Sequence, residues 1–254
     1  MKKSLLFLAV IGCLFCACTA SAQIGNTQMY FNGGYQGSVW SGGPEGSVAT
    51  GFYDGSVNQT AVGPGQNSPG FICDDYYDNV YTGEHWTATS YQASTLNAGN
   101  IGQDTLFGNA NWSAVVSGWT GVQGYQALAY LVNDMFTNGV GNSALQSSIS
   151  QALWYLTSLA VGRGFSLSSL DATAQSLVAY VQHISNDPAL STYSNLWLYT
   201  QPFNPNGPQE MWGQIGLGPV PEGGATLAYL LLVALACTGA VYQSRRRAGR
   251  SQSI

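Results

Sequence analysis

Cys73 has the clearest capacity for chemistry in this chain, because it is the only cysteine between residues 23 and 219. It follows Phe71 and Ile72, which read as the start of a strand. An oxidising compartment permits disulfides, but this stretch of chain offers no partner cysteine. The thiol is therefore buried and inert, paired between chains, or chemically used.

Carboxylates gather directly after this cysteine, at Asp74, Asp75 and Asp78. Oxygen ligands of this kind suit Ca²⁺, but their spacing matches no calcium-binding loop, so the sequence favours a solvated acidic turn. Glu84 and His85 follow a few residues later. They supply an alternative function, an exported hydrolase that uses Asp74, Asp75, Glu84 or His85 for acid–base chemistry.

Patterns typical of known catalytic sites are missing from residues 23–219. The stretch holds two histidines, His85 and His183, and neither lies in a zinc-binding pattern. It also has no Gly-x-Ser-x-Gly elbow, no phosphate loop and no dinucleotide fingerprint. The sequence therefore predicts a protein that is not an enzyme and that uses no metal or cofactor.

The charge of residues 23–219 is strongly negative, at −10, because eleven acidic residues stand against one basic residue, Arg163. Nucleic acids and anionic lipid surfaces bind basic patches, so both are excluded as partners of this stretch. Divalent cations and cationic polymers fit the charge better. Arg163 follows a predicted helix and is expected to interact with that helix's C-terminus or with one carboxylate.

The elements that position these residues are predicted from periodicity and turn signals. Short strands are expected at 29–31, 38–40, 49–53, 71–73, 87–91, 196–199 and 210–212. From Thr120 the apolar spacing becomes helical and predicts three helices. The pattern indicates an α+β domain with a β-rich N-terminal part, a three-helix segment packed on the sheet, and late strands.

Each predicted helix has its own signals. The first begins at a capping box formed by Thr120 and Gln123. The second carries a leucine stripe from 145 to 159 with Trp154 on the opposite side, so it should pack on both sides. The third is expected to begin with Ser168 as its cap and Asp171 in its first turn.

The second helix also carries Ser150-Gln151-Ala152-Leu153-Trp154. Together with the aromatic-x-Cys pattern at Cys73, this sequence resembles the thioester-domain adhesins. In that family a cysteine and a helical Gln-x-Ala-Ile/Leu-Trp glutamine condense with loss of ammonia, and the thioester captures amines on a target. The resemblance thus implies the alternative of a covalent adhesin that uses Cys73 and Gln151.

The match departs from the family at the reacting amide. Ser150 stands at the family's glutamine position, and Gln151 is rotated about 100° around the helix from it. Gln146 lies on the same side as Ser150 but about 6 Å lower along the axis. We therefore expect Cys73 to be a small buried hydrophobe rather than a thioester.

The N-terminus, residues 1–22, has the pattern of a secretory signal peptide. Lys2 and Lys3 precede an apolar run, and Ala20-Ser21-Ala22 forms a small-x-small cleavage site. Gln23 is then the first mature residue. A lipoprotein that uses Cys18 is the alternative, but the residues before Cys18 fit that pattern poorly.

The C-terminus, residues 220–254, has three parts in a fixed order: a short motif, an apolar helix at 225–242 and an arginine cluster. The apolar run is 18 residues long, enough at about 1.5 Å per residue to cross most of a hydrocarbon core of roughly 30 Å. The arginines should remain cytoplasmic. The motif and cluster residues are Val220, Pro221, Glu222, Gly223, Gly224, Arg245, Arg246 and Arg247.

This tail resembles the sorting signal of the PEP-CTERM class in its Val-Pro-x-x-Gly form, which exosortase transpeptidases read. An ordinary single-pass anchor is the alternative. The resemblance implies an exported protein, held briefly in the inner membrane and then released to the cell surface or an extracellular matrix. Its expected partners are an exosortase-like transpeptidase, the membrane, and a surface polysaccharide or matrix, and its expected role is structural or adhesive.

Overall fold

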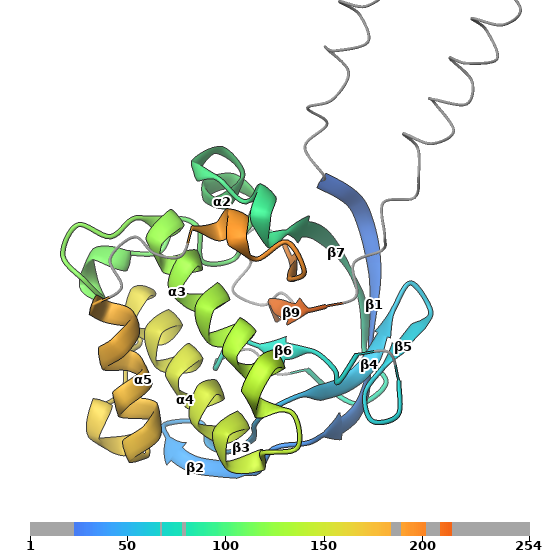
Figure 1. Ribbon diagram of the computed structural model, residues 1–254, viewed down its shortest axis with the longest axis horizontal. Coiled ribbons are helices and arrows are strands. Elements are labelled where there is room, and N and C mark those ends of the chain that lie inside the picture. The colour runs from blue at the N-terminus through green and yellow to red at the C-terminus, as the bar shows by residue number, and fades with distance from the viewer. Residues whose placement is uncertain (1–22, 67, 78–79, 184–188, 202–208, 215–254) are drawn as a thin grey trace, which may run out of the picture. The chain divides into compact units, whose positions relative to one another are not determined.

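A seven-stranded antiparallel sheet is the frame of the fold (Figure 1). The computed structural model describes residues 23–66, 68–77, 80–183, 189–201 and 209–214, all within one compact unit that extends to residue 216. The strands are β1 (Gln23–Tyr35), β2 (Val39–Gly43), β3 (Gly46–Ala49), β4 (Tyr53–Val57), β5 (Thr60–Val62), β6 (Ile72–Cys73), β7 (His85–Gln92), β8 (Trp197–Thr200) and β9 (Met211–Gly213). The hairpin β2–β3 forms a separate two-stranded sheet.

The large sheet curls so that the start of β4 meets the segment just before β6. Its order is β5-β4-β1-β7-β8-β9-β6, and every pairing is antiparallel. Tyr53 at the start of β4 and Phe71 just before β6 exchange backbone hydrogen bonds of 2.8 and 2.9 Å. The late strands β8 and β9 therefore fill the gap between β7 and β6, and Cys73 lies on the strand beside β9.

Four α-helices are present in the described part of the chain: α2 (Ala98–Asp104), α3 (Gly121–Asp134), α4 (Ser143–Ala160) and α5 (Ala172–His183). Figure 1 shows α3, α4 and α5 together as a layer beside the sheet. The α+β class and the three helices after Thr120 are confirmed. The short helix α2 was not predicted.

The start of the third predicted helix differs from expectation. Ser168 does not cap it but lies in a short 3₁₀ turn, Leu167–Ser169. The helix begins at Ala172, and Oδ1 of Asp171 accepts a 2.7 Å hydrogen bond from the backbone N–H of Ala174. Asp171 therefore has the capping role, because it satisfies a backbone N–H that has no partner within the helix.

Helix α4 is buried on both sides, as its pattern predicted. Ile149 and Leu156 are fully buried on the leucine stripe, and Trp154 is 2 % exposed. The indole N–H of Trp154 donates to the backbone oxygen of Cys73 at 3.1 Å, and Oγ1 of Thr157 donates to that of Asp74 at 2.7 Å. These two hydrogen bonds attach α4 to the sheet at Cys73 and Asp74.

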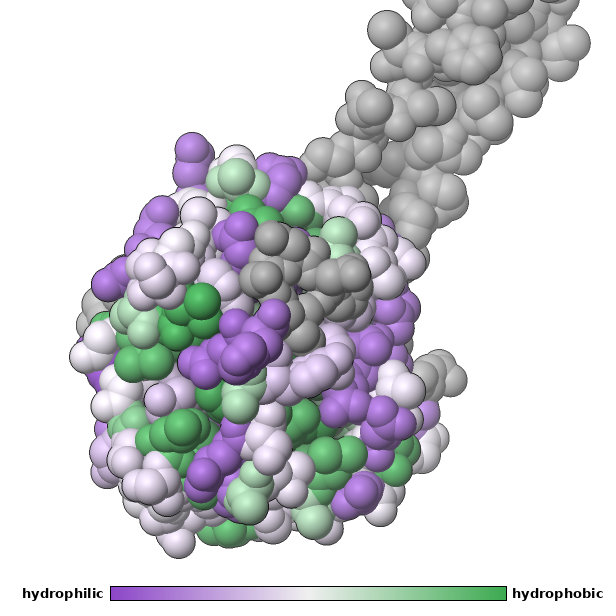
Figure 2. Space-filling model, turned by 60° about the vertical axis from the view of Figure 1, so that its left-hand side comes forward, coloured by the Kyte–Doolittle hydropathy of each residue, from purple (hydrophilic) through white to green (hydrophobic). Residues whose placement is uncertain are grey.

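On the face that Figure 2 shows, hydrophobic residues lie in small groups among polar ones. Such a mixture is normal for a domain whose large apolar side chains are mostly inside. Among the residues described, no helix is both long enough and apolar enough to cross a bilayer. The predicted signal peptide, the tail at 220–254 with its helix at 225–242, and Asp78 lie outside the described residues.

Candidate functional site

Cys73 is buried, at 1 % exposure. Its Sγ donates to the backbone oxygen of Asp75 at 2.9 Å and accepts from the backbone N–H of Asp75 at 3.3 Å. Burial raises the pKa of the thiol well above its usual value, and the charges of Asp75 and Asp74 raise it further. A thiol that stays protonated is a poor nucleophile, and its burial is as predicted for a small hydrophobe.

The glutamines of α4 have partners of their own. The carboxamide of Gln151 donates to Asp171 Oδ2 at 2.8 Å and to Ser147 Oγ at 3.3 Å, and accepts from the Asp171 backbone N–H at 2.9 Å. Gln146 donates to the Gly139 carbonyl at 2.8 Å. Gln151 therefore binds the start of α5, and the structure does not bring its amide to the thiol of Cys73.

Ser150, at the position of the family's glutamine, receives a 2.9 Å hydrogen bond from the backbone N–H of Gly51. Thioester formation would release one molecule of ammonia, about 17 Da. We therefore expect the intact mass of the mature domain to show no such loss. Incubation with methylamine followed by peptide mapping is the second measurement. A methylamine adduct on Gln146 or Gln151 would contradict this prediction.

The expectation of a solvated acidic turn is wrong for Asp74 and Asp75, which are 0 % and 7 % exposed. The carboxylate of Asp74 accepts a 2.6 Å hydrogen bond from the indole N–H of Trp212, on β9. Oδ1 of Asp75 accepts a 3.0 Å bond from the backbone N–H of Tyr77. These partners replace water, and Trp212 was not predictable as a partner because it lies 138 residues away in the sequence.

Glu210 is a buried acid for which the sequence predicts no functional role. It accepts from the hydroxyl of Tyr125 at 2.7 Å, from the backbone N–H of Leu106 at 3.1 Å, and from the hydroxyl of Thr200. Desolvation raises the pKa of Glu210. The only signal in the sequence is that Glu210 begins the predicted strand at 210–212, and this signal is weak.

Asp74 and Glu210 form a buried acid pair. Desolvation is the main reason that the pKa of Asp74 is raised well above its usual value, and the charge of Glu210 adds to it. Ionising two neighbouring carboxylates in a buried site is energetically unfavourable, because the two negative charges repel each other and lack water. We call Asp74 and Glu210 the acid pair; the pKa values of both are raised, chiefly by desolvation.

The remaining predicted site residues lie at the surface. Oε2 of Glu84 accepts from the backbone N–H of Tyr81 at 2.9 Å, and His85 is an exposed residue at the start of β7. The guanidinium of Arg163 stands 5.3 Å from the ring centre of Tyr77, so its observed partner is an aromatic ring. Within the described ranges, no three His, Cys, Asp or Glu side chains are placed to hold a metal ion.

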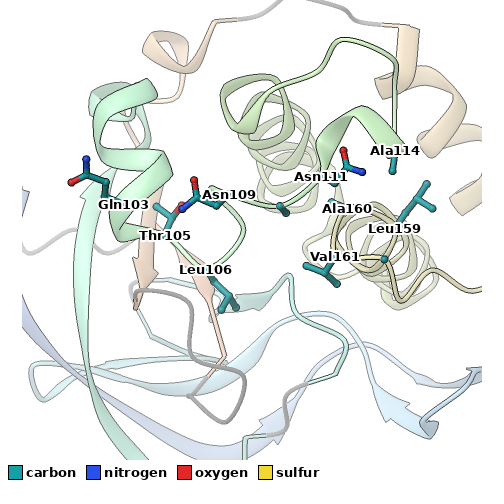
Figure 3. Close-up of a pocket in the computed structure, with 11 residues that line it drawn as sticks. Gln103, Thr105, Leu106, Asn109, Asn111, Ala114, Leu159, Ala160 and Val161 are labelled. Carbon is teal, nitrogen blue, oxygen red and sulfur yellow. The ribbon is translucent and has the colours of Figure 1, made fainter.

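A cleft of about 500 Å³ lies between α2, the loop that follows it and the end of α4 (Figure 3). Its lining combines amide and hydroxyl side chains with small apolar ones, and none of them is charged. The lining residues are Gln103, Thr105, Leu106, Asn109, Ala110, Asn111, Ala114, Leu159, Ala160, Val161 and Gly162. Figure 3 shows Gln103 and Thr105 across the opening from Leu159 and Val161.

A second cleft, of about 280 Å³, has Asp75 and Trp154 among its lining residues and so lies beside the segment 73–75. We call it the aromatic cleft, because rings of Phe, Tyr and Trp residues form much of its lining. Its residues are Phe31, Gly33, Tyr35, Ser47, Val48, Ala49, Tyr53, Asp75, Tyr76, Val80, Trp154 and Gln209. Asp75 is the one acidic residue among them.

Comparisons of this chain with protein-family models, with curated proteins and with solved structures found no match. Function must therefore be argued from the residues and from the geometry just described.

Proposed function

We propose that this chain is an exported cell-surface or extracellular-matrix protein, processed by an exosortase-like transpeptidase, with a structural or adhesive role. The order of the tail carries the proposal: the motif at 220–224, the apolar run at 225–242 and then the arginines. The motif by itself is short and therefore weakly specific. The order and spacing of the three parts make the whole pattern specific. The signal-peptide pattern at 1–22 supports the same route.

In this proposal the mature domain covers residues 23–219, and the helix at 225–242 holds it in the inner membrane until cleavage near Pro221 and Glu222. Arginines after an apolar run favour the orientation in which the domain faces away from the cytoplasm. The released domain then joins a surface polysaccharide or another matrix component. Its charge of −10 favours cationic over anionic contacts there.

The chemistry of the described residues supports a role other than catalysis. Cys73 is buried with a raised pKa, and Asp74 is enclosed with Glu210 and Trp212. A general acid or nucleophile must reach a substrate, whereas these groups bond to the protein itself. Buried polar networks of this kind typically fix the packing of a core.

Cell fractionation tests the route. We expect antibodies against the domain to find it in the surface or extracellular fraction, without the tail epitope. Replacing Pro221 and Glu222 with alanine should leave domain and tail joined in the inner membrane, whereas Pro219→Ala, just outside the motif, should not. The proposal fails if the wild-type chain keeps both epitopes together in the inner membrane, or if a reporter placed before residue 220 resides in the cytoplasm.

A further inference from the structure

The aromatic cleft combines two features that select the same kind of ligand. Its lining brings together rings from separate elements: Phe31 and Tyr35 on β1, Tyr53 on β4, and Trp154 on α4. Phe31 and Trp154 are mostly buried, at 8 % and 2 % exposure, and Tyr35 is 44 % exposed. The face of an aromatic ring carries partial negative charge and attracts cations, most strongly where water is excluded.

The second feature is Asp75, an acid that is among the residues lining the cleft and is 7 % exposed. Its position is fixed, because Oδ1 accepts a 3.0 Å hydrogen bond from the backbone N–H of Tyr77. A nearly buried carboxylate gains most from a positive partner, since water screens it weakly. Carboxylate and rings together therefore favour a cation over a neutral or anionic ligand.

The surroundings of the aromatic cleft supply little positive charge that could compete with a cationic ligand. Glu45 donates its backbone N–H to the hydroxyl of Tyr76, a lining residue, so a further acid lies close to this cleft. Arg163, the single basic residue of 23–219, places its guanidinium over Tyr77 and is not part of the cleft lining. The net field of a domain with charge −10 attracts cations.

We propose that the aromatic cleft is a non-covalent binding site for the ammonium group of an organic cation, a primary or quaternary amine. Its volume of about 280 Å³ fits a head group or a side-chain end rather than a whole large ligand. The exposed ring of Tyr35 lies at the surface end, where the rest of the ligand would continue. Adhesion through amine groups on a matrix polymer rests on the function proposed above; the binding itself does not.

Binding of tetramethylammonium is the direct test. We expect saturable binding to the full-length chain, purified in a nonionic detergent, in equilibrium dialysis with the labelled cation. Tert-butanol, a neutral molecule of similar shape, and Na⁺ at the same ionic strength should compete at least about tenfold less well, since both lack the combination of charge and apolar surface. Equal competition by tert-butanol, or binding that does not saturate, would overturn the proposal.

Variants place the site. Asp75→Asn keeps an oxygen for the Tyr77 N–H and should weaken binding about tenfold, and Tyr35→Ala about fivefold, whereas Tyr35→Phe keeps the ring and should bind nearly as wild type. Tyr180→Ala removes a tyrosine that is 53 % exposed on α5, outside the cleft, and should change nothing.

Near-ultraviolet circular dichroism shows whether Asp75→Asn is folded. If it is not, the comparison of Tyr35→Ala with Tyr35→Phe decides, because Tyr35 is half exposed. Equal affinities of those two variants would assign the binding to another place and overturn the proposal. Failure of the sorting experiment would leave these affinities unchanged, so the two proposals fail separately.

Discussion

Gly124→Ala is expected to lower the free energy of unfolding by about 2–3 kcal/mol. A Cβ on Gly124 would lie 2.2 Å from two ring carbons of Trp112, far inside van der Waals contact. The ring cannot move away easily, because Trp112 is 1 % exposed and its indole N–H donates to the Phe107 carbonyl at 2.8 Å. The added methyl must push α3 off the ring, and urea unfolding followed by circular dichroism measures the loss.

Gly102→Ala is the matched control, since it too adds a methyl group inside a helix. A Cβ on Gly102 would have the amide oxygen of Asn109 at 3.4 Å as its nearest neighbour, which is ordinary contact. Alanine is favoured over glycine in helices by about 1 kcal/mol, so this variant should be as stable as the wild type or more so. Equal effects of the two substitutions would show that α3 does not pack on Trp112 as described.

The helical half of the fold was predictable because its signals are local. The capping box at Thr120 is present, with the backbone N–H of Thr120 donating to Gln123 Oε1 at 2.9 Å. The helical spacing of apolar residues covers several turns in α3 and α4, which makes the period unambiguous. Helix α2 has seven residues and one buried side chain, Ile101, so it offers no stripe to detect.

The closure of the sheet was not predictable from one sequence. Strands are predicted at 71–73 and 210–212, and β6 and β9 lie there, but strands of two and three residues do not specify a partner or a register. Their pairing joins Cys73 to Met211, nearly 140 residues apart. No local sequence pattern indicates such a pairing, because it depends on loop closure and on the packing of the whole domain.

The same distance explains what was missed at the candidate site. A run of aspartates reads as solvated when its partners are unknown, and the partners of Asp74 and Glu210 come from β9, β8 and α3. The burial of Cys73 was predictable, because a lone cysteine in an apolar strand context usually behaves as a small hydrophobe. The partner of the Gln151 amide depends on where α5 begins, and the sequence predicts a start earlier than the observed one at Ala172.

The free energy of unfolding is expected to fall as the pH rises above the ordinary pKa values of the two buried acids Asp74 and Glu210. The pKa values of Asp74 and Glu210 are raised above their ordinary 3.8 and 4.5, chiefly by desolvation. The folded chain therefore keeps protons that the unfolded chain releases. The stability that these protons contribute is fully present below the ordinary pKa values. It is lost as the pH rises through the raised pKa values of the folded chain, at about 1.4 kcal/mol per pH unit for each retained proton.

The groups that face the acid pair do not offset this trend. Tyr125, Thr200 and Trp212 donate hydrogen bonds to the pair, which favours ionisation but does not cancel desolvation. The pKa of Asp54, on β4, is also raised by desolvation and changes stability in the same direction, by less because its carboxyl is more accessible. Urea titrations at each pH give the slope.

Asp74→Asn separates the acid pair from every other titrating group. Asparagine has nearly the same shape, and its amide oxygen can still accept the indole N–H of Trp212. It carries no charge, so Glu210 loses the neighbour whose ionisation competes with its own. We expect the variant to be more stable than the wild type at pH 8 and to lose most of the pH slope. Glu45→Gln is the control, because it removes an exposed carboxylate and should keep the wild-type pH dependence of stability. If Asp74→Asn also kept that pH dependence, the proton retained on folding would be held by another group.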